Sequence, residues 1–92
     1  MRVVINGLKY DTDKMELISS ICQWKWTSKF GDYCFKAREV KLFKSNRGHW
    51  LLTYRTDYRN CARALTEDEA KNLLMLFDID AYEKIFGELE EA

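Results

Sequence analysis

Three cysteines and a single histidine are the residues of this chain whose types could carry chemistry. Cys22, Cys34, Cys61 and His49 have the donor atoms of a Cys3His zinc site. Structural zinc sites draw ligands in pairs about two to four residues apart, and no two of these residues are that close. We therefore predict no metal and no cofactor. The thiols are expected to act as small hydrophobic groups in a reducing compartment.

A nucleophile pair is the second chemistry that these residue types allow. It would join the thiol of Cys61 or Cys34 to the imidazole of His49, with Asp57 orienting the ring. No motif brings these side chains together, and the chain has no Gly-rich phosphate loop. The sequence therefore predicts a protein that is not an enzyme, with no catalytic residues.

Charge is sorted along the chain, although the formal net charge is zero. Residues 24–63 hold ten Lys or Arg against three Asp or Glu, a net of +7, together with 9 of the 13 aromatic residues. Residues 64–92 hold nine acids against two lysines, a net of −7. A neutral molecule of this kind is suited to bind a charged partner, or a second copy of itself as a homodimer.

Two alternative sets of binding residues follow from this sorting, and a third interpretation is that the cations form only an ordinary solvated face. In the preferred set, basic charge steers the partner and aromatic rings supply affinity. Its members are Trp24, Trp26, Lys41, Arg55, Tyr58, Arg59 and Arg63. In the alternative set, carboxylates imitate a row of phosphates. Its members are Glu83, Glu88, Glu90 and Glu91.

The hydrophobic pattern predicts a single α+β domain over residues 1–92, a small antiparallel sheet with two to three helices packed on one face. Asn6-Gly7 is typical of the tight turn of a hairpin. Alternating residues predict strands over 33–44 and 49–56, paired so that Leu42 faces Leu52 and Glu39 faces Arg55. A further short strand is expected over 59–65, and residues 23–32 form a loop or an irregular strand.

Three helices are predicted from capping signals. Asp13 followed by Glu16 favours a helix over 12–22. Thr66 followed by Glu69 is a capping box, and the apolar spacing after it predicts a helix that shares a core with the strands. That core is expected to contain Val40, Leu42, Leu52, Leu73, Leu74 and Phe77. Asp80 begins the last helix, whose apolar positions extend to Leu89.

Several segments together resemble a group of short proteins encoded by bacterial phages and mobile elements. The segments are Ile5-Asn6-Gly7-Leu8-Lys9-Tyr10-Asp11-Thr12 at the start, Lys41-Leu42-Phe43 and Gly48-His49-Trp50-Leu51-Leu52 in the hairpin, and Leu65-Thr66-Glu67-Asp68-Glu69-Ala70-Lys71 and Tyr82-Glu83-Lys84-Ile85-Phe86-Gly87-Glu88 near the end. The resemblance implies an accessory protein that binds a host protein or nucleic acid.

Some phage accessory proteins of this kind inhibit host defence nucleases, anti-CRISPR proteins among them. We therefore expect a non-enzymatic inhibitor that acts by surface binding in the cytoplasm of a bacterial host cell, with a CRISPR effector nuclease as candidate target. The alternative is a small accessory protein that binds nucleic acid through the basic aromatic region. No apolar run approaches the roughly 20 residues of a membrane span, so no membrane partner is expected.

Overall fold

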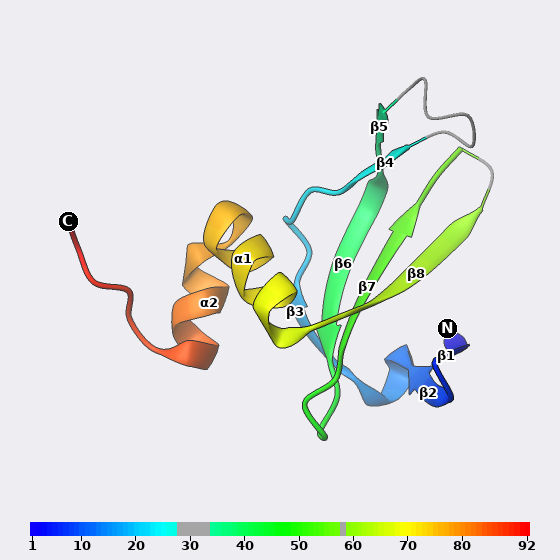
Figure 1. The fold of residues 1–92 in the computed structure, drawn as a ribbon, viewed down its shortest axis with the longest axis horizontal. Coiled ribbons are helices and arrows are strands. Elements are labelled where there is room, and N and C mark those ends of the chain that lie inside the picture. The colour runs from blue at the N-terminus through cyan, green and yellow to red at the C-terminus, as the bar shows by residue number, and fades with distance from the viewer. Residues whose placement is uncertain (28–33, 58) are drawn as a thin grey trace.

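The computed structural model describes residues 1–27, 34–57 and 59–92, with side chains for all of these except 26, 27, 34 and 35. The elements are drawn in Figure 1. The strands are β1 (Arg2–Ile5), β2 (Leu8–Asp11), β3 (Glu16–Ser19), β4 (Lys25–Thr27), β5 (Cys34–Lys36), β6 (Arg38–Lys44), β7 (Trp50–Arg55) and β8 (Asn60–Leu65). The helices are the 3-10 turn η1 (Thr12–Lys14), α1 (Glu67–Phe77) and α2 (Ile79–Phe86).

A four-stranded antiparallel sheet in the order β3-β6-β7-β8 forms the centre of the molecule, and both α-helices pack on one face of it. Leu42, Trp50, Leu52 and Leu74 are almost wholly buried between the two layers. All six residues predicted for the shared core lie there, with Phe77 partly buried at its border. The predicted α+β class is therefore confirmed. Neither α-helix in the described part of the chain is long and apolar enough to cross a membrane.

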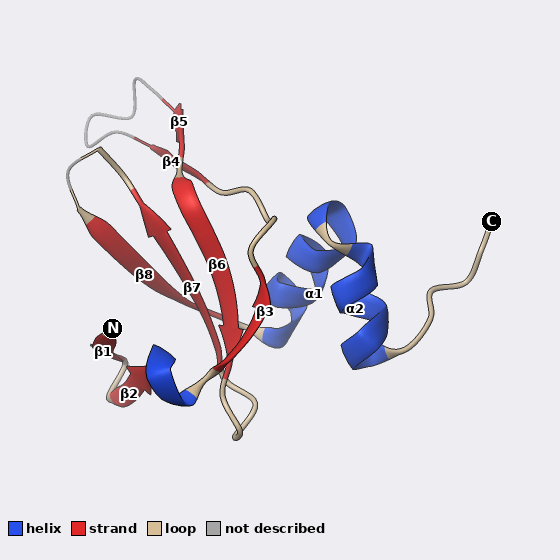
Figure 2. Cartoon of the chain, turned by 180° about the vertical axis from the view of Figure 1, so that it is seen from behind, coloured by secondary structure: helices blue, strands red, loops and turns tan. Residues whose placement is uncertain are grey.

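The N-terminal hairpin covers part of the opposite face. Asn6 and Gly7 adopt φ angles of 51° and 79°, as the predicted tight turn between β1 and β2 requires. Figures 1 and 2 show this hairpin and the helices on opposite sides of the sheet. Leu51 points toward the hairpin side and is fully buried, so each face of the sheet has its own apolar layer.

The predicted pairing of β6 with β7 is correct near the turn and wrong at the far end. Leu42 faces Leu52 as expected, but Arg55 faces Arg38 and not Glu39. A β-bulge lies between Arg38 and Lys41, and Glu39 within it has a φ of 50°. One extra residue in β6 shifts the pairing beyond that point.

The predicted helix over 12–22 is wrong. Only the single turn η1 forms, because Asp11 accepts a hydrogen bond from the backbone N–H of Asp13 and ends β2 there. The chain then enters β3, in which Leu17 faces Phe43 of β6. Four apolar residues, Leu17, Ile18, Ile21 and Cys22, would share one face of a helix over 12–22. In the structure Leu17 and Ile21 are exposed, whereas Cys22 is buried in the core and Ile18 packs against it, so the four do not form one buried face. Backbone pairing with the sheet outweighs the local helical pattern.

The remaining elements follow the predictions with small shifts. The first strand of the main hairpin divides at the buried residue Ala37 into β5 and β6, while β4 supplies the irregular strand expected within 23–32. The capping box of α1 forms as predicted, since Thr66 and Glu69 exchange hydrogen bonds of 3.1 and 3.2 Å. The backbone N–H of Thr66 lowers the pKa of Glu69. Helix α2 is capped by Asp78, not Asp80, and ends before Leu89.

Candidate anion-binding surface

Two pairs of like charges face each other across adjacent strands. Lys25 of β4 lies directly opposite Lys36 of β5, and Arg38 of β6 lies directly opposite Arg55 of β7. All four side chains are exposed. Like charges in directly opposed positions destabilise a sheet. The first pair belongs to the separate two-stranded sheet β4-β5, which lies at the end of β6, and the second pair belongs to the four-stranded sheet, so cations gather where the two sheets meet (Figure 1).

The β-bulge places a fifth cation on the same face. In a regular strand, Arg38 and Lys41 are an odd number of residues apart and would point to opposite faces. The extra residue at the bulge lets Arg38 face Arg55 while Lys41 faces Thr53, and Arg55 and Thr53 share one face of β7. Lys36 joins them, because it and Arg38 flank a residue buried in the helix-side core. We call Lys25, Lys36, Arg38, Lys41 and Arg55 the cationic face.

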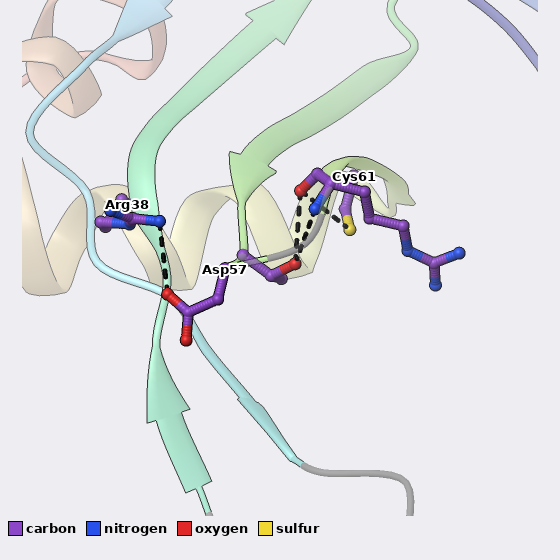
Figure 3. Close-up of polar contacts among 5 residues, drawn as sticks. Arg38, Asp57 and Cys61 are labelled. Atoms are coloured by element: carbon purple, nitrogen blue, oxygen red, sulfur yellow. Dashed lines mark hydrogen bonds and ion pairs between the residues drawn. The ribbon is translucent and has the colours of Figure 1, made fainter.

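Two carboxylates partly compensate this charge: Glu39 of the bulge, which lines a hollow together with Lys41 and Arg55, and Asp57. Asp57 lies in the turn after β7, and its Oδ1 is 3.3 Å from the guanidinium of Arg38 (Figure 3). The turn is held by hydrogen bonds between Thr56 and Arg59, so Asp57 is positioned before any partner binds. Both partners of the ion pair are more than 60% exposed. An ion pair this exposed is screened by water and contributes little to stability.

A hollow of about 200 Å³ opens beside the cationic face. Lys41 and Arg55 line it together with the acid Glu39, with Phe43 and Thr53 of the sheet, and with Thr12 of η1. The two cations outnumber the one carboxylate in the lining, and together with the ring of Phe43 they suit a side chain that ends in a carboxylate. The hollow is small, so one such side chain is the size of group that it would accept.

The structure separates the predicted binding residues between the two faces of the sheet. Lys41 and Arg55 belong to the cationic face, whereas Arg63 faces Leu52 and therefore lies on the helix side. There the guanidinium of Arg63 sits 5.4 Å from the ring centroid of Trp24, and that ring packs against Tyr54 at 6.3 Å. Burial raises the pKa of Tyr54. Trp24 and Arg63 are thus occupied with each other at the border of the core.

Three other predicted residues have different positions. Arg59 is exposed in the turn between β7 and β8, next to the cationic face. Tyr58 lies outside the described residues, and so does the side chain of Trp26. The backbone of Trp26, in β4, faces that of Phe35 in β5. Lys25, Lys36 and Arg38 were missing from the prediction, because their common face depends on strand pairing that no local pattern reveals.

The four alternative acidic residues differ in how available their carboxylates are to a partner. Glu83 is half buried, and its Oε2 accepts a hydrogen bond of 2.9 Å from the backbone N–H of Leu89. Glu88, Glu90 and Glu91 are exposed in the segment after α2. Glu83 therefore has a structural role, since this hydrogen bond ties the segment after α2 back to the helix. The other three carboxylates remain available to a basic partner.

The candidate residues for nucleophilic chemistry lie far apart. His49 adjoins the 45–48 turn at one end of β7, whereas Cys61 faces Tyr54 near the other end. Asp57 pairs with Arg38, as Figure 3 shows, and does not orient an imidazole. Cys22 is buried, and burial raises the pKa of its thiol. Among the residues that the structure describes, no group of three or more His, Cys, Asp or Glu side chains is placed to hold a metal ion.

Comparison of the chain with protein-family models, with curated proteins and with solved structures found no match.

Proposed function

We propose that this chain is a non-enzymatic binding protein that docks its cationic face on an acidic surface of a partner protein. The observation that carries the proposal is the two pairs of opposed like charges, Lys25 with Lys36 and Arg38 with Arg55. Their mutual repulsion weakens the free protein. An acidic partner would relieve that repulsion. Part of the binding free energy would therefore come from removing an unfavourable interaction that is present in the free protein.

The distribution of charge favours a protein partner over nucleic acid. Most dedicated nucleic-acid-binding domains carry a large net positive charge, whereas this chain has a net charge of zero. The acids of α1 and α2 lie on the opposite side of the sheet from the cationic face. No ion pair within 4.0 Å links these helices to the strands in the described part of the molecule. The protein is therefore dipolar, and a dipole orients it during approach to a charged protein.

The hollow beside Lys41 and Arg55 supports the same proposal. Charge at an exposed rim mainly accelerates association, while a filled pocket slows dissociation. An acidic side chain of the partner would enter the hollow between these two cations, with its methylene groups against Phe43. Steering and anchoring would then be combined within one surface.

The resemblance to phage and mobile-element proteins suggests the kind of partner. A host defence nuclease, such as a CRISPR effector, is the candidate target, because an enzyme that cleaves nucleic acid has acidic residues at its catalytic centre. The chain would inhibit such an enzyme by occupying an acidic surface, in the cytoplasm of a bacterial cell. No residue of the chain would act on a substrate.

Nucleic-acid binding is the second candidate function. It is favoured by the continuity of the cationic face, since Lys36 and Arg38 are two residues apart in the same ribbon and both are exposed. Such a strip would bind phosphates without reading sequence. The aromatic ring of Trp24, which would add stacking, is already covered by Arg63.

Capture from a bacterial lysate, with and without nuclease treatment, tests the proposal. The two variants Arg55→Glu and Lys84→Glu change the net charge equally, but only Arg55 belongs to the cationic face. We expect a nuclease-resistant protein partner whose affinity falls on the order of ten-fold or more with Arg55→Glu and is unchanged with Lys84→Glu. The purified partner, if a nuclease, should be inhibited by the wild-type chain and by the Lys84 variant.

Three results would contradict the proposal. If capture disappears after nuclease treatment and the chain shifts the mobility of DNA or RNA, the nucleic-acid alternative is correct. If Arg55→Glu and Lys84→Glu weaken binding equally, only overall charge matters. If Arg55→Glu has no effect and truncation after Gly87 abolishes binding, the acidic residues Glu88, Glu90 and Glu91 form the interface.

A further inference from the structure

A second and larger hollow lies at the other end of the sheet. Its volume is about 420 Å³, within the range of small-molecule sites. It opens between strand β2, the turn η1 and the turn at residues 45–48 that joins β6 to β7. The lining residues that matter here are Leu8, Lys9, Lys14, Met15, Arg47 and His49.

Three cations from separate segments converge on this hollow. Lys9 comes from β2, Lys14 from η1 and Arg47 from the β6–β7 turn, and all three are exposed. The acid in the lining, Asp11, is already engaged, because its side chain accepts from the N–H of Asp13 at 3.1 Å and lies 4.0 Å from Arg2. Neither ion pair found among the described residues involves any of the three cations. The hollow therefore offers uncompensated positive charge to a ligand.

The walls of the hollow are apolar and partly aromatic. Leu8 is 43% exposed and Met15 is half buried, so apolar surface faces the opening. Tyr10 is buried, and its ring meets the ring of His49 edge to face at 6.3 Å. The imidazole of His49 is exposed and held by this contact. A flat ring could pack against His49 and the apolar wall while an acidic group reached the cations.

The backbone around the hollow is held in place by hydrogen bonds. In the β6–β7 turn, Ser45 exchanges bonds of 2.8 to 3.0 Å with Gly48 and His49. On the other side, the N–H of Met15 donates to the carbonyl of Thr12 and closes η1. A ligand would therefore enter a cavity that already exists, and little binding energy would be lost in ordering loops.

We propose that this hollow binds a nucleotide, with the phosphate among Lys9, Lys14 and Arg47 and the base against His49 and the apolar wall. Phosphate is the acidic group that clustered Lys and Arg recognise best, and a base supplies the flat ring. The nucleotide could be a free mononucleotide or a unit of a strand. The inference is independent of the proposed function, because none of these residues belongs to the cationic face.

Isothermal titration with adenosine monophosphate, adenosine, inorganic phosphate and a short adenine oligonucleotide tests the site. Lys14→Gln and Arg47→Gln remove one cation each, and Lys84→Gln, at an exposed position of α2 that belongs to neither binding surface, is the matched control. We expect saturable binding of adenosine monophosphate that weakens at least ten-fold in the first two variants and is unchanged in the control. Unchanged thermal melting will show that the exposed substitutions leave the fold intact.

Other outcomes either identify the source of the nucleotide or overturn the proposal. Tighter binding of the oligonucleotide than of the mononucleotide, lost in Lys14→Gln and Arg47→Gln, would indicate a strand, and the reverse would indicate a free nucleotide. Inorganic phosphate or adenosine binding as tightly as adenosine monophosphate would overturn the assignment. So would the absence of saturable binding at millimolar concentration, or equal losses in all three variants.

Discussion

Replacing Leu74 by alanine tests the packing of α1 on the sheet. The side chain of Leu74 is fully buried in the helix-side core, which also holds Leu42, Trp50 and Leu52. The substitution deletes three carbon atoms, worth about 2.4 kcal/mol at about 0.8 kcal/mol each. The cavity that remains adds to this loss. The higher helix propensity of alanine returns only a few tenths of a kcal/mol. We therefore expect the free energy of unfolding to fall by about 3 kcal/mol, within the usual range of about 2–5.

Leu76 provides a matched control in the same helix. It lies two residues further on and is 74% exposed, so Leu76→Ala should change the free energy of unfolding by less than about 0.5 kcal/mol. Urea denaturation of both variants and the wild type, analysed by linear extrapolation, gives the comparison. A loss below about 1 kcal/mol for Leu74→Ala, outside the range for buried leucines, would refute the packing described here. Equal losses in the two variants would do the same.

The remaining predictions concern the bulge, the thiols and association. Glu39→Gly should raise the free energy of unfolding by about 0.5–1 kcal/mol in the same assay. Removing Cβ relieves a positive φ that costs about 1–2 kcal/mol, and the greater conformational freedom of glycine in the unfolded chain offsets part of that gain. A decrease would mean that the Glu39 side chain stabilises the bulge. In native protein a thiol reagent should modify the half-buried Cys61 readily and Cys22 only on unfolding, since burial raises the pKa of Cys22 and disfavours its thiolate; equal rates would contradict the burial of Cys22. Chelator and reductant should leave the melting temperature unchanged, and a fall of several degrees with chelator would revive the zinc hypothesis. Sedimentation at about 0.05 M and about 0.5 M salt tests the predicted homodimer: if exposed charges hold two copies together, they should associate at the lower salt and dissociate at the higher; a monomer at both concentrations would exclude it.

Local sequence signals correctly predicted those parts of the fold that depend on only a few neighbouring residues. The Asn6-Gly7 turn and the Thr66–Glu69 capping box each depend on residues no more than three apart, and both form as expected. Alternation also predicted the pairing of Leu42 with Leu52, because a slip of one residue would turn every apolar side chain away from the core.

The errors arose where distant strands compete with local preference. The apolar residues of segment 17–22 have a spacing that suits a helix, yet residues 16–19 pair with the edge of β6. The bulge at Glu39 is likewise a property of the β6–β7 pair, and it moves Arg38 to the face that carries Lys41. A single strand, considered alone, contains neither signal.

By itself, the sequence determined that basic and acidic charge occupy different parts of the chain, and that the last two helices are amphipathic. Both properties depend only on composition and on the spacing of nearby residues. Only the tertiary structure decided which cations share a face. Lys25 and Lys36 are eleven residues apart and Arg38 and Arg55 seventeen, and strand pairing makes each pair direct neighbours. It also decided that Trp24 packs against Tyr54 beneath Arg63, on the side of the sheet away from Lys41 and Arg55. The physical reason is that side chains on a sheet alternate between faces, so the surface to which a residue belongs depends on its partner in the register.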